Sequence, residues 1–216
     1  SAAEAVGANA LLARTASYYH DIGKFEKREF FIENQYGFNP HDTIPPEESA
    51  HVLNEHVNRG LEVADKHHLP KVIKDVIVQH HGTTLMQYFY HKAKKSTPDN
   101  AEVAKFRYHG PLPQSKESGI IMLADSVEAS VRSMENPTKE RIREKVKEII
   151  ENKFNEGQLD NCELSLRDLQ IVEDSFVATL SAQQHHRIPY PSRQEISEDL
   201  GGKDLETAST EEKQAQ

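Results

Sequence analysis

The sequence predicts an all-α protein built as a helical bundle, and three features of the pattern indicate this class. Apolar residues recur at intervals of three and four positions through most of the chain, as they do on the buried face of a helix. Glycine and proline fall between these runs, where helices are expected to end. No run alternates apolar and polar residues over the length of a strand, so no β-sheet is expected.

The first third of the chain predicts two helices around a loop. Residues 2–22 contain few helix breakers apart from Gly7, and Gly23 is placed to end this helix as a C-cap. Residues 25–46 carry glycine and proline, which predicts a loop with a short helical piece. A second helix is predicted from about residue 47 to 66, on five apolar positions at helical spacing: Ala50, Leu53, Val57, Leu61 and Ala64.

The middle of the chain predicts a short helix and then an excursion. Pro70 opens the helix, which runs into His80-His81, and four apolar residues are expected on its inner face: Val72, Ile73, Val76 and Ile77. Residues 91–117 are polar, locally basic and contain three prolines. We therefore expect residues 91–117 to form an excursion or lid, outside the core.

Three further helices are predicted after this segment. The run 118–134 has a stripe formed by Ile120, Ala124, Val127 and Val131, and Asn136-Pro137 stops it. Thr138 restarts an amphipathic helix that ends near Gly157. Ser165 and Asp168 have the spacing of a capping box for the last helix, whose inward positions are Leu169, Val172, Phe176 and Leu180.

The chain is expected to form one domain, residues 1–191, followed by a disordered acidic tail, residues 192–216, which has few large apolar groups. Cys162 is the single cysteine, so no internal disulfide can form and a reducing compartment is expected. No apolar run has the length needed to span a bilayer. The sequence begins within an alanine-rich helical pattern without a starting methionine, so we expect a piece of a larger protein.

The composition argues against one function class and points to another. The formal net charge of -9 argues against binding to DNA or RNA through a basic surface. The 12 histidines exceed an ordinary share, and histidine is the commonest metal ligand. Histidine spacing is therefore the first place to look for a site.

Metal-type side chains occur at four places in separate helical segments, each beside an apolar stripe: His20-Asp21, His56, His80-His81 and Asp125. Such positions are expected to face the interior of a bundle, where dinuclear sites are built from facing helices. Imidazoles with carboxylates suit Fe, Mn or Zn, and an aspartate can bridge two cations. Two adjacent cations activate water and stabilise a phosphoryl group, so phosphoester hydrolysis is the expected reaction.

Each of these signals alone is more often structural, as a cap, a helix end or a surface acid. Their occurrence together is what favours a site. For six of the remaining histidines we favour surface or hydrogen-bonding roles: His41, His51, His67, His68, His91 and His109. His185-His186 could lie near the site, but a structural role is favoured for this pair as well.

Substrate contacts are also predicted. Lys24, one turn after His20, is placed to approach a substrate phosphate, and Arg132, two turns after Asp125, could face the same opening. Tyr88 belongs to an aromatic run that could stack a base, although core packing is the commoner fate of such a run. The basic residues between Lys92 and Arg107 could form a rim that attracts an anion.

The series His20-Asp21, His56, His80-His81, Asp125 resembles that of the HD-domain metal-dependent phosphohydrolases. The flanking stretches YYHDIGK, HVNRG, HHGTTLMQYFYHKA and ADSVEASVRS look like the cytoplasmic domain of seven-transmembrane HD proteins that hydrolyse cyclic di-AMP. The resemblance covers residues 1–191.

This resemblance implies an HD-type bundle with two divalent cations, Fe or Mn, in its core. His20, Asp21 and Asp125 would hold one cation, and Asp21 would bridge to a second held by His56, His80 and His81. Activated water would open cyclic di-AMP to linear 5′-pApA, with Asp21 and Lys24 as the catalytic side chains.

The family also implies features outside this sequence. A membrane anchor would precede the chain in a bacterial protein, and the domain would lie in the cytoplasm. A further histidine of the family would precede Ser1, which leaves the first cation one ligand short here. The alternatives are hydrolysis of another nucleotide (cyclic di-GMP, guanosine tetraphosphate or a dNTP) and a nucleotide sensor without catalysis. Metal identity, base specificity and oligomeric state do not follow from the sequence.

Overall fold

The computed structural model describes residues 1–35, 37–96 and 101–185, and the predicted tail 192–216 lies outside these residues. The chain divides into two units, Ser1–Ser181 and Ala182–Gln216, and the buried clusters all lie in the first unit. Helices account for all regular structure in the described part, apart from one isolated antiparallel bridge between Leu85 and Arg107. The prediction of an all-α fold is therefore confirmed.

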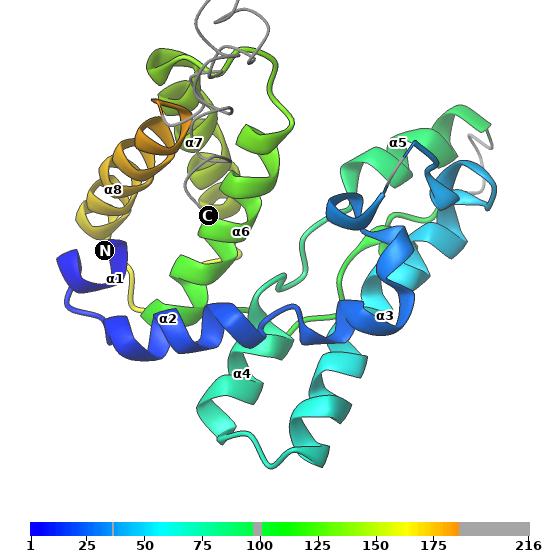
Figure 1. The fold of residues 1–216 in the computed structure, drawn as a ribbon, viewed down its shortest axis with the longest axis horizontal. Helices are drawn as coiled ribbons and strands as arrows, with labels where there is room; N and C mark the ends of the chain where they lie inside the picture. The colour runs from blue at the N-terminus through cyan, green and yellow to red at the C-terminus, as the bar shows by residue number, and fades with distance from the viewer. Residues whose placement is uncertain (36, 97–100, 186–216) are drawn as a thin grey trace, which may run out of the picture. The chain divides into compact units, whose positions relative to one another are not determined.

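The described residues form α-helices joined by short 3₁₀ helices (Figure 1). The α-helices are α1 (Ala2–Ala5), α2 (Ala10–Tyr19), α3 (Pro46–Lys66), α4 (Lys71–Gln79), α5 (Gln87–Ser96), α6 (Lys116–Arg132), α7 (Lys139–Asn155) and α8 (Leu166–His185). The 3₁₀ helices are η1 (Ile22–Phe30), η2 (Ile32–Asn34), η3 (Pro40–Asp42) and η4 (Val103–Phe106).

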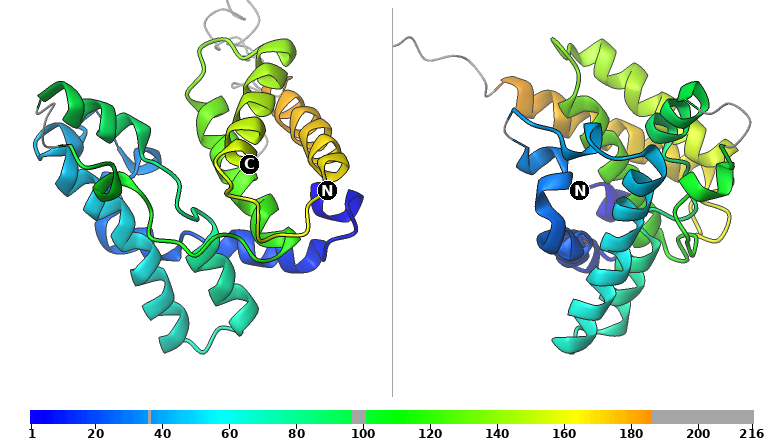
Figure 2. Two further views of the ribbon diagram at one scale, coloured as in Figure 1. Left: turned by 180° about the vertical axis from the view of Figure 1, so that it is seen from behind. Right: turned by 90° about the vertical axis from the view of Figure 1, so that its right-hand side faces the viewer.

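The buried apolar side chains form three clusters. Cluster 1 joins α1, α6, α7 and α8, which lie beside one another in Figures 1 and 2, and includes Met122 and Val172. Cluster 2 joins α2, α4 and the end of α3, around Ala16 and Ile77. Cluster 3 joins the start of α3 to α5 and η4, around Phe106. Burial of these side chains is the main stabilising contribution to the bundle.

The first predicted helix, 2–22, is wrong in its extent. Gly7 adopts a φ of 70°, which breaks the run into α1 and α2, because this left-handed conformation ends a helix readily at glycine. Gly23 is not a C-cap: α2 ends at Tyr19, and Gly23 lies inside η1.

The segment 91–117 is not the excursion that its polarity predicts. Phe106 is fully buried, and Ala93 and Ala101 are buried with it in cluster 3. The many charged side chains of this segment make it look exposed in the sequence. They remain at the surface while a few small and aromatic residues enter the core. On α4, Val72 is 50% exposed, so its expected inward position is wrong, whereas Ile73, Val76 and Ile77 are buried.

The later helices begin and end close to the predicted positions. Thr138 caps α7 through Arg141 N, and the predicted capping box is present, because the Ser165 and Asp168 side chains each accept a backbone N–H from the other residue. On α8, Leu169 and Val172 are buried while Phe176 and Leu180 are partly buried.

Candidate metal centre

The His20-Asp21 pair lies where α2 passes into η1. His20 keeps helical backbone angles, but Asp21 has φ -104° and ψ 13°, outside the helical range. This change of direction lets two neighbouring side chains face the same point, which a continuous helix would not allow. Nε2 of His20 lies 3.2 Å from Oδ2 of Asp21.

A glycine contact sets the distance from this pair to α3. A Cβ atom on Gly23 would lie 1.9 Å from the carbonyl oxygen of His56 and 2.4 Å from the amide nitrogen of Gly60. Only glycine allows η1 to pass this close to α3. As a result, Oδ1 of Asp21 lies 3.4 Å from Nε2 of His56.

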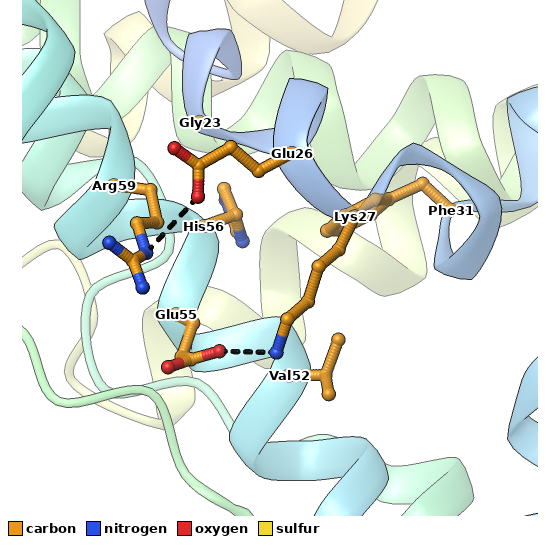
Figure 3. Close-up of a pocket in the computed structure, with 8 residues that line it drawn as sticks. All are labelled: Gly23, Glu26, Lys27, Phe31, Val52, Glu55, His56 and Arg59. Atoms are coloured by element: carbon orange, nitrogen blue, oxygen red, sulfur yellow. Dashed lines mark hydrogen bonds and ion pairs between the residues drawn. The ribbon is translucent and has the colours of Figure 1, made fainter.

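Two ion pairs beside His56 reinforce this contact (Figure 3). Lys27 Nζ lies 2.7 Å from Glu55 Oε2, and Arg59 Nε lies 3.5 Å from Glu26 Oε2. Each pair joins η1 to α3, so the residues around Gly23 are held against α3 at several points.

His80 and His81 lie at the C-terminal end of α4. Nε2 of His80 is 3.3 Å from Nε2 of His56 and 3.6 Å from Oδ1 of Asp21. The next residue, Gly82, has a φ of 52°, and a Cβ there would meet the side chain of Gln158 at 2.5 Å. The chain therefore turns sharply after the histidines.

Side chains from later in the sequence hold the turn after His81. Gln158 accepts the N–H of Thr83 at 2.9 Å and donates to its Oγ1 at 3.0 Å. Lys153 Nζ donates to Oγ1 of Thr84 at 2.6 Å, and the ring of Tyr108 stacks on that of His81 at 4.1 Å. These contacts fix the orientation of the His81 ring.

Asp125, on α6, completes the arrangement. Its Oδ1 lies 3.6 Å from Nε2 of His20, and its Oδ2 lies 3.9 Å from Nδ1 of His81. The structure thus brings together all six side chains that the sequence singled out. They form two groups whose donor atoms lie within 4.8 Å of one another: Asp21, His56, His80 and His81, and His20, Asp21 and Asp125.

Three of the imidazoles are oriented by the backbone of their own helical segment. The Nδ1 atoms of His20, His56 and His80 each face the carbonyl oxygen three residues earlier. This contact favours the tautomer with the proton on Nδ1 and leaves Nε2 as a lone-pair donor toward the centre. His81 differs, because its Nδ1 is the nitrogen near Asp125.

The electrostatics of the cation-free protein follow from burial and charge. Burial, and then the neighbouring His80, lowers the pKa of His56 to about 4. Burial lowers the pKa of His20 too, but Asp125 and Asp21 outweigh it and raise this pKa to about 10. Burial raises the pKa of Asp21, and His20 and His80 outweigh it, so this pKa falls well below its usual range. Both aspartates are carboxylates at neutral pH, since the pKa of Asp125 is lowered as well.

The donor set fits divalent cations. Nε2 of His20 and Oδ1 of Asp21 are buried atoms that lack a hydrogen-bond partner within the described residues. Buried polar atoms rarely remain unpaired without a reason, and a coordinated ion is one such reason. Nitrogen and oxygen donors without thiolate match Fe, Mn or Zn.

A cavity of about 350 Å³ opens beside this centre between α2, η2 and α6. Besides His20, Asp21 and Asp125, it is lined by Lys24 and Arg132, two of the substrate-binding candidates, and by Glu33 and Glu128. Lys24 Nζ lies 2.7 Å from Asp21 Oδ2. Burial lowers the pKa of Lys24, but the Asp21 carboxylate outweighs it and the pKa is raised, so the ammonium stays charged.

The other substrate candidates do not line this cavity. Tyr88, on α5, is 64% exposed and contacts Phe89, which is buried in cluster 3. Of the expected basic rim, Lys92 pairs with Asp42 and Arg107 donates to the carbonyl of Thr83. Of the six histidines expected in surface or hydrogen-bonding roles, His41 is buried, with its Nε2 2.9 Å from the carbonyl oxygen of Phe30, and the others are exposed: His51, His67, His68, His91 and His109. The side chains of His185-His186 lie outside the described part of the chain.

Sequence reasoning missed four residues around the centre: Tyr108, Glu33, Glu128 and Lys153. Glu33 and Glu128 resemble ordinary surface acids in the sequence. Tyr108 lies in a segment whose polarity masked its burial, and Lys153 lies on a helix face that is otherwise apolar. Only Lys153 carries a signal in the sequence, because it is a charged residue at a position of the apolar stripe formed by Ile142, Val146 and Ile150.

Comparison with known proteins agrees with this geometry. The family model described as HD domain matches residues 1–130, and the chain belongs to the HD domain family. The six donors lie within the matched range, whereas Lys153 and Gln158, which hold the turn after His81, lie beyond it.

Among individual proteins, the chain is 46% identical over 190 residues to "Cyclic-di-AMP phosphodiesterase PgpH" of Listeria monocytogenes serotype 1/2a (strain 10403S). It is also 46% identical over 192 residues to PgpH of Bacillus subtilis (strain 168). These alignments cover 88% of this chain but 26% and 27% of the two relatives, so the chain spans about a quarter of their length.

Solved structures give the same result. The L. monocytogenes PgpH HD domain in complex with cyclic-di-AMP matches with a TM-score of 0.82 and 44% identity, over 84% of this chain and 85% of that chain. A second structure of the same domain matches with a TM-score of 0.81 and 43% identity, over 85% of this chain and 86% of that chain. The HD-type architecture expected from the motifs is thus confirmed.

Proposed function

We propose that this domain is a metal-dependent phosphodiesterase that hydrolyses cyclic di-AMP to linear 5′-pApA. The convergence of six nitrogen and oxygen donors on two points that share Asp21, beside a cavity with two basic side chains, carries the proposal. The likeness to PgpH, whose HD domain has been solved with cyclic-di-AMP, supports this substrate over other nucleotides.

In this proposal His20, Asp21 and Asp125 would hold one divalent cation, and Asp21, His56, His80 and His81 would hold the other. Iron or manganese suits these donors. When bound, the two cations supply a water of lowered pKa as nucleophile and neutralise charge on the phosphoryl group. Asp21 is catalytic because each of its oxygens faces one of the two groups.

The remaining side chains act on the substrate. The Lys24 ammonium stabilises the negative charge that builds on the phosphoryl oxygens, as a preorganised cation does in a partly buried site. Arg132 binds the second phosphodiester across the cavity, and Tyr88 offers a face for stacking a base at the surface. Charged Lys24 and Arg132 side chains and the acidic protein as a whole fit a small anion and not DNA or RNA.

The wider context is also a proposal. The domain comprises residues 1–191, and in the complete protein it lies on the cytoplasmic side of a bacterial membrane, anchored by a preceding segment. Among the described residues, no helix combines the length and the apolar character that crossing a bilayer requires. A histidine supplied from upstream would add a donor beside His20.

The test pairs a product assay with metal analysis. Protein loaded with Mn²⁺ or, anaerobically, Fe²⁺ is expected to convert cyclic di-AMP to 5′-pApA faster than it hydrolyses cyclic di-GMP, guanosine tetraphosphate or a dNTP. Asp21→Asn should bind fewer cations and lose turnover. His67→Ala is the matched control, because His67 is exposed and, unlike His68 with its φ of 53°, has ordinary backbone angles.

The outcomes separate the alternatives. Equal effects of the Asp21 and His67 variants would refute the site. Faster turnover of another nucleotide would make that nucleotide, and not cyclic di-AMP, the assigned substrate. Tight binding of cyclic di-AMP without any product, in protein with both cations bound, would identify a sensor.

A further inference from the structure

One carboxylate that lines the cavity, that of Glu33, pairs with both basic side chains there, Lys24 and Arg132. Glu33, on η2, places Oε1 3.1 Å from Nζ of Lys24 and Oε2 4.0 Å from Nη2 of Arg132. Its side chain is 33% exposed, so it lies at the opening and not in the core. It belongs to neither of the two donor groups.

The neighbouring carboxylates are arranged differently. Asp21 contacts Lys24 but not Arg132, and Glu128 contacts Arg132 at 3.5 Å but not Lys24. Among the described residues that line the cavity, Glu33 alone pairs with both. Glu33 therefore lies between two cationic side chains, Lys24 and Arg132, in the position that a phosphodiester would take.

We propose that Glu33 is a resident anion that a phosphodiester must displace from Lys24 and Arg132, and that it thereby lowers the affinity of the cavity for phosphate ligands. The inference rests on the proposed function, in which these two side chains bind phosphate oxygens. A carboxylate and a phosphodiester each carry about one negative charge, and like charges at the same cations repel. The carboxylate and the phosphodiester therefore compete for the side chains of Lys24 and Arg132.

This competition sets a threshold for binding in the cavity. A ligand must replace the ion pairs of Glu33 before it gains from its own contacts, so a small anion gains little net free energy. A cyclic dinucleotide has two phosphodiesters and two bases, which offer enough other contacts to offset the loss. Glu33 thereby keeps inorganic phosphate and short phosphate esters, which bind through few contacts, from occupying the cavity at low concentration.

The variant Glu33→Gln tests this, because glutamine keeps the size of the side chain and removes its charge. Its KM for cyclic di-AMP with Mn²⁺ is expected to fall about fivefold while kcat changes less than about twofold, as suits the loss of partly exposed ion pairs. The Kd for inorganic phosphate, measured by calorimetry on the metal-free protein, is expected to fall by about the same factor.

Two matched variants complete the experiment. Glu62→Gln removes the same charge from α3, where Glu62 pairs with Arg59 at 3.1 Å outside the cavity, and should change neither constant. Glu128→Gln frees only Arg132 and should have a smaller effect than Glu33→Gln.

A KM and a phosphate Kd that are unchanged or higher in Glu33→Gln would overturn the inference, and higher values would mean that Glu33 positions Lys24 for the substrate. Failure of the proposed function gives a different result, because the wild-type protein would then hydrolyse no cyclic di-AMP. The phosphate measurement still tests Glu33 in that case, since it needs neither cations nor turnover.

Discussion

Replacing Lys153 by methionine is expected to stabilise the metal-free protein. Lys153 lies on α7 with 7% of its surface exposed, and burial lowers its pKa from 10.5 to about 8, against the opposing effects of Glu156 and Asp125. One pKa unit corresponds to about 1.4 kcal/mol, so keeping the ammonium charged costs the fold about 3 kcal/mol. Methionine removes this cost and loses the hydrogen bond to Thr84, a loss of about 1 kcal/mol. The expected gain in the free energy of unfolding near neutral pH is about 2 kcal/mol.

The pH dependence has a definite sign. Below the folded-state pKa of about 8, the lysine is charged in both the folded and the unfolded chain, and the whole cost is present. Between about 8 and 10.5 the unfolded chain binds the proton of this lysine more strongly, so the cost that Lys153 imposes on stability falls as the pH rises. The advantage of Lys153→Met should therefore shrink across this window. Urea unfolding followed by circular dichroism near neutral pH and near the upper end of the window measures the difference.

Lys147→Met is the control on the same helix. The Lys147 side chain is 60% exposed and pairs loosely with Glu151 at 3.8 Å, so its replacement should change the free energy of unfolding by less than about 0.5 kcal/mol at either pH. If Lys153→Met is destabilised equally at both pH values, the hydrogen bond to Thr84 outweighs the burial of charge, and the reasoning is refuted.

Two other predictions concern the metal centre. Gly23→Ala should lower the free energy of unfolding by about 3 kcal/mol or more and weaken Mn²⁺ binding, because its Cβ would lie 1.9 Å from the carbonyl of His56. Unfolding and Mn²⁺ titrations measure both effects, and unchanged stability would contradict the close contact. Cation binding near neutral pH should release about one proton, because His20, with a pKa of about 10, must lose one whereas His56, with a pKa of about 4, is already neutral. Calorimetry in buffers of different ionisation enthalpy counts the protons, and the absence of any release would contradict the protonation of His20.

Much of the fold follows from periodicity, because the apolar residues of a long amphipathic helix such as α7 recur at helical spacing and are the ones that become buried. On α3 the agreement is weaker, since only Ala50 and Ala64 of the five predicted positions are buried. The donors were predictable for a related reason. Each lies at a helix end or on a flank beside an apolar stripe, so its direction is fixed by the helix that carries it. Asp125 follows from α6 in this way, and His80 from α4.

What the sequence did not predict depends on contacts between distant segments. Gly23 looks like a helix C-cap, and only the passage of η1 across α3 shows that its missing Cβ is the reason for glycine there. Phe106 is buried because α3 and α5 pack against it, and the polar residues around it in the sequence do not indicate this burial. The proposed role of Glu33 depends on its ion pair with Arg132, which lies about a hundred positions later in the chain and is not visible in the sequence around Glu33.

The six donors are carried by segments that pack into three separate apolar clusters, with Asp125 on α6, His80 on α4 and His56 on α3. A shift of α6 along α2 by about one ångström would part Asp125 from His20, and misplacement on that scale costs about a hundredfold in rate. Melting temperature and turnover therefore measure different things in this molecule. A volume-conserving substitution where α6 packs on α2 can therefore lower the rate far more than it lowers the unfolding temperature.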